Sequence, residues 1–179
     1  MRSWGFIGPT YTTPTTYAAS ERTVNLFPEM IESPNGERSR WLLRKAPGLR
    51  TFVTLDGGPV RELFYQDGRC FAIAGRNLYE LFATRSTTFL GSLATDTRPA
   101  RIVSSGVTGN ELFITSGGYG YIFDLTANTL TQITDADFPY PVSMGVWADG
   151  YFVALKSNSA VFQISDLLDG TAWDALDFA

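Results

Sequence analysis

A repeat of about 40 residues, which begins at Val60, limits the folds open to this chain more than any other pattern in it. The turn dipeptides Asp67-Gly68, Gly109-Asn110 and Asp149-Gly150 begin 42 and 40 residues apart. Each turn is followed by a short apolar strand, and then by a small-residue turn and another strand. A period near 40 residues with four short strands per unit is typical of a β-propeller blade. The sequence therefore predicts an all-β, β-propeller-like fold whose blades contain four antiparallel strands.

The repeat predicts four strands in each of the first two units and three strands in the third. The inner strands, such as Cys70-Phe71-Ala72-Ile73, are continuous apolar runs, as expected when a blade is covered on both faces. Because a ring needs at least four blades, we expect a fragment of a propeller, or one closed by more chain or by another subunit. The predicted strands are 60–65, 69–74, 77–82, 87–93, 101–105, 111–116, 119–124, 129–133, 142–147, 151–156 and 160–165.

The residues before the repeat form a separate region with its own turn signals. Pro34-Asn35-Gly36 is a strong turn signal, and it predicts a hairpin between strands 22–27, which Pro28 ends, and 39–44. A further strand is predicted at 49–55. We therefore divide the chain into an N-terminal arm and hairpin region, 1–59, and about three blades, 60–179, within one continuous domain. The proline-rich opening, 1–19, is either an arm on a neighbouring subunit or a segment packed on its own domain.

The chain lacks the residues that several classes of catalysis and metal binding need. The chain has no histidine and one cysteine, Cys70, which excludes Ser-His and Cys-His catalysis and zinc-thiolate sites. The acidic pairs Asp135 with Asp137 and Asp166 with Asp169 are weak candidates for a glycosidase, because acids in loops are normally solvated. Cys70 is expected to be a small buried hydrophobic residue. We predict a non-enzymatic protein without cofactor or metal.

Charge is divided unevenly along the chain. Residues 1–101 carry 13 Lys and Arg against 9 Asp and Glu, a balance of +4, whereas residues 102–179 carry 1 Lys against 9 acids, a balance of −8. An acidic half is a poor general binder of nucleic acid. The asymmetry suits a protein with one basic and one acidic face, which can orient packed subunits. No apolar stretch approaches the roughly 20 residues of a membrane helix, and no signal peptide is evident.

Two segments are candidates for contacts with partners. The basic segment 38–45 contains an aromatic residue, which suits DNA or an acidic partner. The alternation of Trp41 and Leu43 with their neighbours favours instead a half-buried strand with these two residues facing inward. The segment 138–141 alternates aromatic residues with prolines, which suits either a subunit contact or packing between blades. The candidate interaction residues are Arg38, Arg40, Trp41, Arg44, Lys45, Phe138 and Tyr140.

The N-terminal region also carries a family resemblance. The run Ser-Glu-Arg-Thr-Val-Asn-Leu-Phe-Pro-Glu at 20–29, with Ile31-Glu32-Ser33, Asn35-Gly36 and Ala46-Pro47-Gly48-Leu49 after it, resembles the signature of the packaged-DNA stabilisation proteins. These are the tail hub, or head-closure, proteins of short-tailed bacteriophages. The segment 169–179 is similar to a later part of the same family. Phe27 stands where a tyrosine is more usual.

The resemblance implies a structural virion protein of the phage neck or tail, made in the host cytoplasm. It implies a homo-oligomeric ring, a hexamer, that closes the portal channel and retains packaged DNA. The implied partners are the portal and its adaptor and a tail needle or tailspike, with non-specific proximity to DNA and no membrane. Two alternatives stay open: a carbohydrate- or protein-binding β-propeller, and a propeller glycosidase.

Overall fold

The computed structural model describes residues 25–31, 40–107 and 109–178. It contains strands and no helix over these ranges, so none of the described residues form a helix that could cross a membrane. The chain divides between Thr51 and Phe52 into two compact units, and the segment 52–59 belongs to the same unit as the blades. The division of the chain into domains at residue 59 stays a prediction.

The N-terminal unit contains a two-stranded antiparallel sheet of β1 (Leu26–Ile31) and β2 (Arg40–Lys45). The prediction that Pro28 ends a strand is wrong, because Pro28 lies inside β1 opposite Leu43. A proline can occupy a strand that has a neighbour on one side only, since its missing N–H can face away from the ladder. The predicted turn at 34–36 and the predicted arm, 1–19, lie outside the described residues.

The predicted strand at 49–55 is also wrong, because this segment is irregular. None of its side chains is buried, and Leu49 is fully exposed. Without a neighbouring strand, β-forming residues alone do not hold an extended segment in a sheet.

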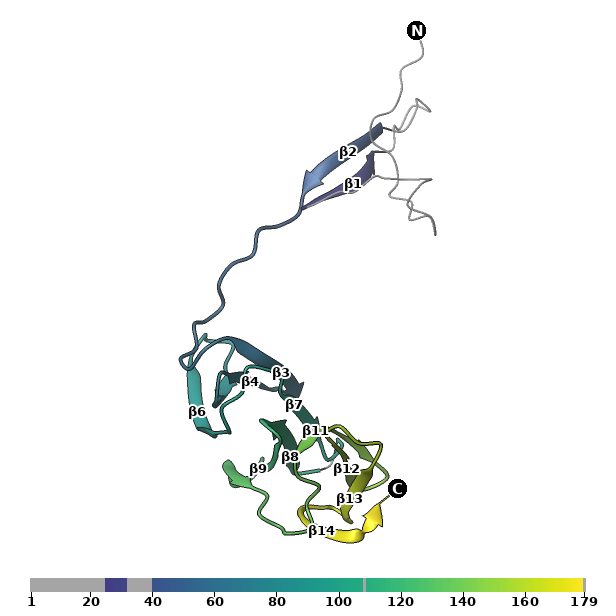
Figure 1. The fold of residues 1–179 in the computed structure, drawn as a ribbon. Helices are drawn as coiled ribbons and strands as arrows, with labels where there is room; N and C mark the ends of the chain where they lie inside the picture. The colour runs from purple at the N-terminus through teal and green to yellow at the C-terminus, as the bar shows by residue number, and fades with distance from the viewer. Residues whose placement is uncertain (1–24, 32–39, 108, 179) are drawn as a thin grey trace, which may run out of the picture. The chain divides into compact units, whose positions relative to one another are not determined.

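The second unit contains three sheets of four antiparallel strands, which follow one another along the chain (Figure 1). In each sheet the strands pair in sequence order, as in a propeller blade. The predicted blade repeat and its strands are therefore confirmed. The first blade is β3 (Val60–Gln66), β4 (Arg69–Ala74), β5 (Asn77–Leu81) and β6 (Thr87–Ser92); the second is β7 (Arg101–Ser104), β8 (Glu111–Ser116), β9 (Tyr119–Asp124) and β10 (Thr129–Gln132); the third is β11 (Val142–Ala148), β12 (Tyr151–Lys156), β13 (Phe162–Asp166) and β14 (Asp169–Phe178).

Tight hairpins connect the first two strands of the outer blades. Asp67 and Gly68 have φ of 49° and 82°, and Asp149 and Gly150 have φ of 48° and 93°. Two successive positive φ angles define the type I′ turn, whose twist matches that of the paired strands. In the second blade the dipeptide Gly109-Asn110 instead lies in a longer loop, which runs from Ser105 to β8.

The third blade has a fourth strand that the sequence did not predict. Strand β14 pairs with β13 through Ser165 opposite Trp173 and Asp166 opposite Asp169. The two buried positions of this segment, Gly170 and Trp173, are three residues apart and do not follow the two-residue alternation of a half-buried strand. Gly170 leaves space for Ile122 and Phe152, which a side chain would occupy. Because residue 170 is a glycine, the edge strand β14 can pack closely against the second blade.

Two apolar cores lie between the three blades. The first contains Phe71 and Ile73 from the first blade with Leu112 and Ile114 from the second. The second contains Phe113 and Ile122 from the second blade with Phe152 and Trp173 from the third. The middle blade is therefore covered on both faces, because successive residues of β8 point to opposite cores. Cys70, predicted to be buried, is only partly buried because it lies on the face of the first blade that is turned away from the second.

Polar contacts join neighbouring blades beside these cores. The buried guanidinium of Arg61 donates to the carbonyl oxygens of Gly75 and Arg98 and to Oγ of Ser116, at 2.6, 2.7 and 2.9 Å. Between the second and third blades, Oε2 of Glu111 accepts a hydrogen bond from the N–H of Gly170 at 3.0 Å. These contacts fix the register in which blades stack, because each needs one particular partner atom.

Candidate interaction surfaces

Two of the acidic residues that suggested a glycosidase, Asp135 and Asp169, accept hydrogen bonds from neighbouring segments of the backbone. Oδ1 of Asp135 accepts from the N–H of Asp137 at 2.9 Å, and Oδ2 accepts from the N–H of Trp173 at 3.1 Å. Asp166 and Asp169 face each other across the β13–β14 turn, and Asp169 also accepts from Thr171. Among the described residues, no three His, Cys, Asp or Glu side chains are grouped so that they could hold a metal ion.

The basic segment forms part of β2 in the N-terminal unit. Arg44 and Lys45 are exposed, and Arg44 forms an ion pair with Glu29 of the opposite strand. A partly exposed ion pair of this kind contributes about 0–1 kcal/mol to stability, so it leaves the segment free to engage a partner. Arg40 and Trp41 begin β2, opposite Ile31 and Met30, and Arg38 lies outside the described residues.

The aromatic residues of the segment 138–141 are divided between the interior and the surface. Phe138 is buried in the second core, edge-on to Phe113 and Trp173. Tyr140 is 51% exposed and lies against Tyr119, with ring centroids 4.8 Å apart. Of the two, Tyr140 is the residue that a partner can reach, while Phe138 packs between blades.

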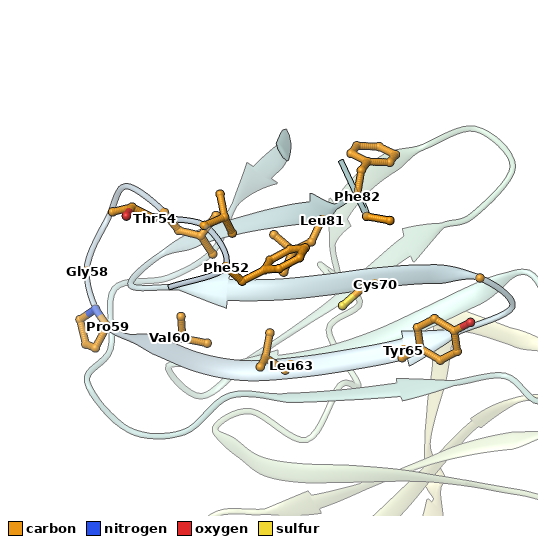
Figure 2. Close-up of a pocket in the computed structure, with 14 residues that line it drawn as sticks. Phe52, Thr54, Gly58, Pro59, Val60, Leu63, Tyr65, Cys70, Leu81 and Phe82 are labelled. Atoms are coloured by element: carbon orange, nitrogen blue, oxygen red, sulfur yellow. The ribbon is translucent and has the colours of Figure 1, made fainter. Parts of the chain in front are cut away.

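A large apolar hollow lies on the outer face of the first blade, the face turned away from the second blade. Its volume is about 1000 Å³. Leu63 and Tyr65 of β3, which are 62% and 70% exposed, form its floor with Cys70 of β4. Figure 2 shows these side chains together with Phe52, from the segment that precedes the blade, and Leu81 of β5. Exposed apolar groups in one continuous patch mark a binding surface more often than scattered ones do.

The outer face of the third blade is apolar as well. Two rows of side chains run across its strands, because Met144 pairs with Leu155 and Leu155 with Phe162, while Val146 pairs with Val153 and Val153 with Ile164. All six residues share one face, since they alternate along their strands with the inward-facing residues. Met144, Val146 and Phe162 are between 42% and 46% exposed.

A smaller polar pocket of about 310 Å³ lies where the connections between blades meet the β8–β9 turn. Arg98 pairs there with Asp96, with 3.0 Å between Nε and Oδ2. The backbone N–H of Arg98 lowers the pKa of Asp96 below its ordinary value, and the N–H of Thr97 and the guanidinium of Arg98 lower it further. The hydroxyl of Thr115 is buried beside them without a hydrogen-bond partner among the described residues.

The sequence predicted the repeat, but it did not predict that the outer faces of the first and third blades expose apolar side chains. The signal was present, because Leu63 and Tyr65 alternate with Glu62 and Phe64, and both sets include apolar residues. In the middle blade, strands with apolar residues at successive positions are buried on both faces. Only the position of a blade in the stack distinguishes a covered apolar face from an open one.

Three successive blades, with a core between each pair and apolar faces at both ends, define a protein of the β-propeller class. The chain belongs to the phage stabilisation family described as bacteriophage P22 Gp10, β-propeller, whose profile matches residues 8–179. It is therefore a phage structural protein, and the resemblance noted from the N-terminal residues is confirmed.

The chain is also similar in structure to parts of several solved proteins. It matches the WD40 domain of Neurospora crassa Pan2 at 12% identity and a TM-score of 0.42, covering 60% of this chain and 32% of that one. It matches the N-terminal domain of Nup159 at 14% identity and a TM-score of 0.41, covering 69% of this chain and 28% of that one. It matches a chain of the mitotic checkpoint complex at 13% identity and a TM-score of 0.46, covering 91% of this chain and 46% of that one. The chain thus spans less than half the length of each, and no curated protein matches its sequence.

Proposed function

We propose that this protein is a component of the phage neck or tail, where it forms a homo-oligomeric ring that closes the portal channel and retains packaged DNA. The observation that carries the proposal is the family match, which extends over residues 8–179. In the virion its neighbours would be the portal and its adaptor on one side and a tail needle or tailspike on the other. The chain would be made in the host cytoplasm before it joins the particle.

The packing of the blades supports a scaffold rather than a catalyst. Each pair of neighbouring blades shares an apolar core, and hydrogen bonds from the Arg61 guanidinium and to the Glu111 carboxylate fix their relative register. Close-packed interiors of this kind transmit force with little deformation. A channel seal that holds DNA under pressure needs such rigidity, and it needs no reactive group.

The charge distribution supports a particular orientation in the ring. Residues 102–179 carry a balance of −8, and an acidic surface repels the phosphates of DNA. In the proposed arrangement this half faces the channel, so that DNA passes without adhering. The basic strand with Arg44 and Lys45 faces an acidic partner.

The proposal is tested in phage particles that lack the protein. A stop codon in its gene is expected to yield heads that package DNA and then lose it, so that the genome becomes sensitive to added nuclease. Supplying the intact chain from a plasmid should restore both protection and infectivity. Particles that keep full-length, nuclease-protected DNA without the protein would overturn the proposal.

A further inference from the structure

We propose that the polar pocket beside the β8–β9 turn binds a single carboxylate group. Three segments line this pocket: the connection between the first and second blades, the β8–β9 turn, and the start of β11. All three lie within the three-blade unit, so the site does not depend on the residues that precede or follow the blades. The inference goes beyond the role in the virion, because it assigns a ligand to the protein.

The buried guanidinium of Arg61 places a positive charge beside the pocket without a counter-ion. Arg61 is 8% exposed, and its hydrogen bonds go to two backbone carbonyl oxygens and to Oγ of Ser116, which lines the pocket. None of the ion pairs formed by the described residues includes Arg61. An arginine stays protonated in proteins, and its field is screened less in the interior than in water. The neutral acceptors therefore leave one positive charge directly behind Ser116.

The two charged residues that line the pocket, Asp96 and Arg98, compensate each other. The Asp96 carboxylate accepts from the N–H of Thr97 at 2.7 Å and from the N–H of Arg98 at 3.1 Å, and it also pairs with Nε of Arg98. Together with Arg61, these residues supply one negative and two positive charges, a balance of +1. One carboxylate cancels this balance, whereas a phosphate group carries about −1.5 to −2 charges and exceeds it.

The pocket lining also has hydrogen-bond donors that the described residues leave without an acceptor. Asp96 engages only Nε of the Arg98 side chain, so the terminal nitrogens Nη1 and Nη2 stay free within the described part of the chain. Over the same residues, the N–H groups of Gly117 and Gly118 donate no hydrogen bond. The hydroxyl of Thr115, a residue 3% exposed, also lacks a partner there. Guanidinium and turn N–H groups are the donors that bind carboxylate oxygens in proteins.

Close packing fixes the β8–β9 turn, which carries two of these donors. Gly117 and Gly118 have φ of 63° and 86°, which glycine adopts readily. A Cβ at residue 117 would lie 2.9 Å from Cβ of Ala94, and a Cβ at residue 118 would lie 3.0 Å from Cβ of Pro141. The connections on either side therefore hold the turn in place. The pocket volume of about 310 Å³ is at the small end of the range for ligand sites, so it suits one carboxylate on a short carbon chain.

Two sources supply such a carboxylate: an acidic side chain of another protein, and a small free carboxylate. Tyr140 separates them, because it is 51% exposed and lies beside the pocket. Its ring carbon Cε2 is 3.7 Å from the position that a Cβ of residue 118 would take. A peptide that inserts an acidic side chain would pack against this ring, whereas a free carboxylate the size of acetate would engage the donors alone.

The first test titrates sodium acetate into the isotope-labelled full chain at constant ionic strength and follows the backbone amide signals by NMR. The signals of Gly117 and Gly118 should shift and saturate. Arg98→Gln should weaken acetate binding by about 10-fold or more, and Thr115→Val, which removes only the hydroxyl, by about 3-fold. Arg50→Gln is the matched control, because it removes the same charge from an exposed position of the N-terminal unit and should leave acetate binding unchanged.

Three results of this titration would overturn the proposal. The first is that acetate leaves the signals of Gly117 and Gly118 in place. The second is that Arg98→Gln and Thr115→Val, shown by circular dichroism to keep the fold, bind acetate as tightly as the unaltered chain. The third concerns inorganic phosphate at about pH 8, where it is mainly a dianion. It should bind more weakly than acetate, and tighter binding would contradict the assignment of the site to a carboxylate.

A capped peptide, Ala-Ala-Glu-Ala-Ala, distinguishes the two sources of the carboxylate. Tighter binding of this peptide than of acetate, weakened more by Tyr140→Ala than acetate binding is, supports the site with an acidic side chain as its ligand. Equal or weaker binding of the peptide supports the site with a small free carboxylate. The same peptide with glutamine in place of glutamate should not bind, and equal affinity of the two peptides would overturn the proposal. None of these results affects the DNA-retention test, and loss of the virion role would leave acetate binding unchanged.

Discussion

The guanidinium of Arg61, in the first blade, donates a hydrogen bond to Oγ of Ser116, in the second, across 2.9 Å. The two residues are 55 positions apart in the sequence, and both are buried. The same guanidinium also holds the carbonyl oxygens of Gly75 and Arg98. One side chain therefore connects the end of a hairpin, the connection between two blades and the central strand of the next blade.

We predict that Arg61→Ala lowers the free energy of unfolding by about 3 kcal/mol, because it leaves three buried acceptors without a donor. The thermal midpoint, followed by circular dichroism, should fall by about 10 °C. Arg101→Ala is the control, since Arg101 is largely exposed and its contact with Glu62 is 4.0 Å long. Its effect should stay within about 1 kcal/mol, and equal effects of the two variants would contradict this account of Arg61.

A methyl group added at Gly145 should destabilise the contact between the second and third blades. Its Cβ would overlap the ring of Phe113, a fully buried residue of the second core. Overpacking of this kind costs about 1–3 kcal/mol, so Gly145→Ala should lower the denaturant midpoint of unfolding. Gly48→Ala is the matched control, because a Cβ there meets nothing within 4 Å. An unchanged midpoint for Gly145→Ala would show that the two blades are not packed as described.

Asp135 and Asp137 lie two residues apart, but their substitutions should differ in effect. Asp135→Asn replaces one acceptor oxygen with a donor, beside the N–H groups of Asp137 and Trp173. We expect a loss of about 1–2 kcal/mol of stability, measured by chemical denaturation. Asp137→Asn changes an exposed side chain and should stay within about 0.5 kcal/mol. The reverse order would show that Asp135 does not anchor β14.

Glu111 should give the protein a component of stability that falls as the pH rises. Burial raises the pKa of its carboxyl, and the negative charges of Asp169 and Asp124 raise it further, against the lowering effect of the Gly170 N–H. The folded protein therefore holds this proton more tightly than the unfolded chain, so ionising the group costs stability above its ordinary pKa. The thermal midpoint of Glu111→Gln, relative to that of the unaltered protein, should rise between about pH 3 and about pH 7.

Asp124 should contribute to stability with the opposite pH dependence to Glu111. The N–H of Ala127, then that of Thr126, lowers the pKa of this carboxylate. It therefore adds stability above its ordinary pKa, and that stability is lost as the pH falls through the lowered value. Over the same range, the midpoint of Asp124→Asn should fall relative to the unaltered protein. If the midpoints of both variants rose, the assignment of Asp124 would be contradicted, and if both fell, that of Glu111 would be.

The sequence alone determined the blades of this protein. Asp67-Gly68 and Asp149-Gly150 place positive-φ residues at hairpin turns, and the apolar strands that follow them are long enough only for a small sheet. Such information is local, because turn chemistry and strand propensity depend on residues a few positions apart. The N-terminal residues likewise indicated the family. The strand at 169–178 escaped prediction because its burial depends on Gly170, whose role is to make room for Ile122 and Phe152.

Only the tertiary structure decided which of these similar strands are covered. Leu63 and Leu112 are both apolar residues of short strands, yet Leu63 is 62% exposed and Leu112 is fully buried. The structure also placed Phe138 in a core and Tyr140 at the surface, and it assigned Asp135 to a backbone contact 38 residues away. The physical reason is that burial in a stack depends on the neighbouring blade, and no pattern within one blade records whether that neighbour is present.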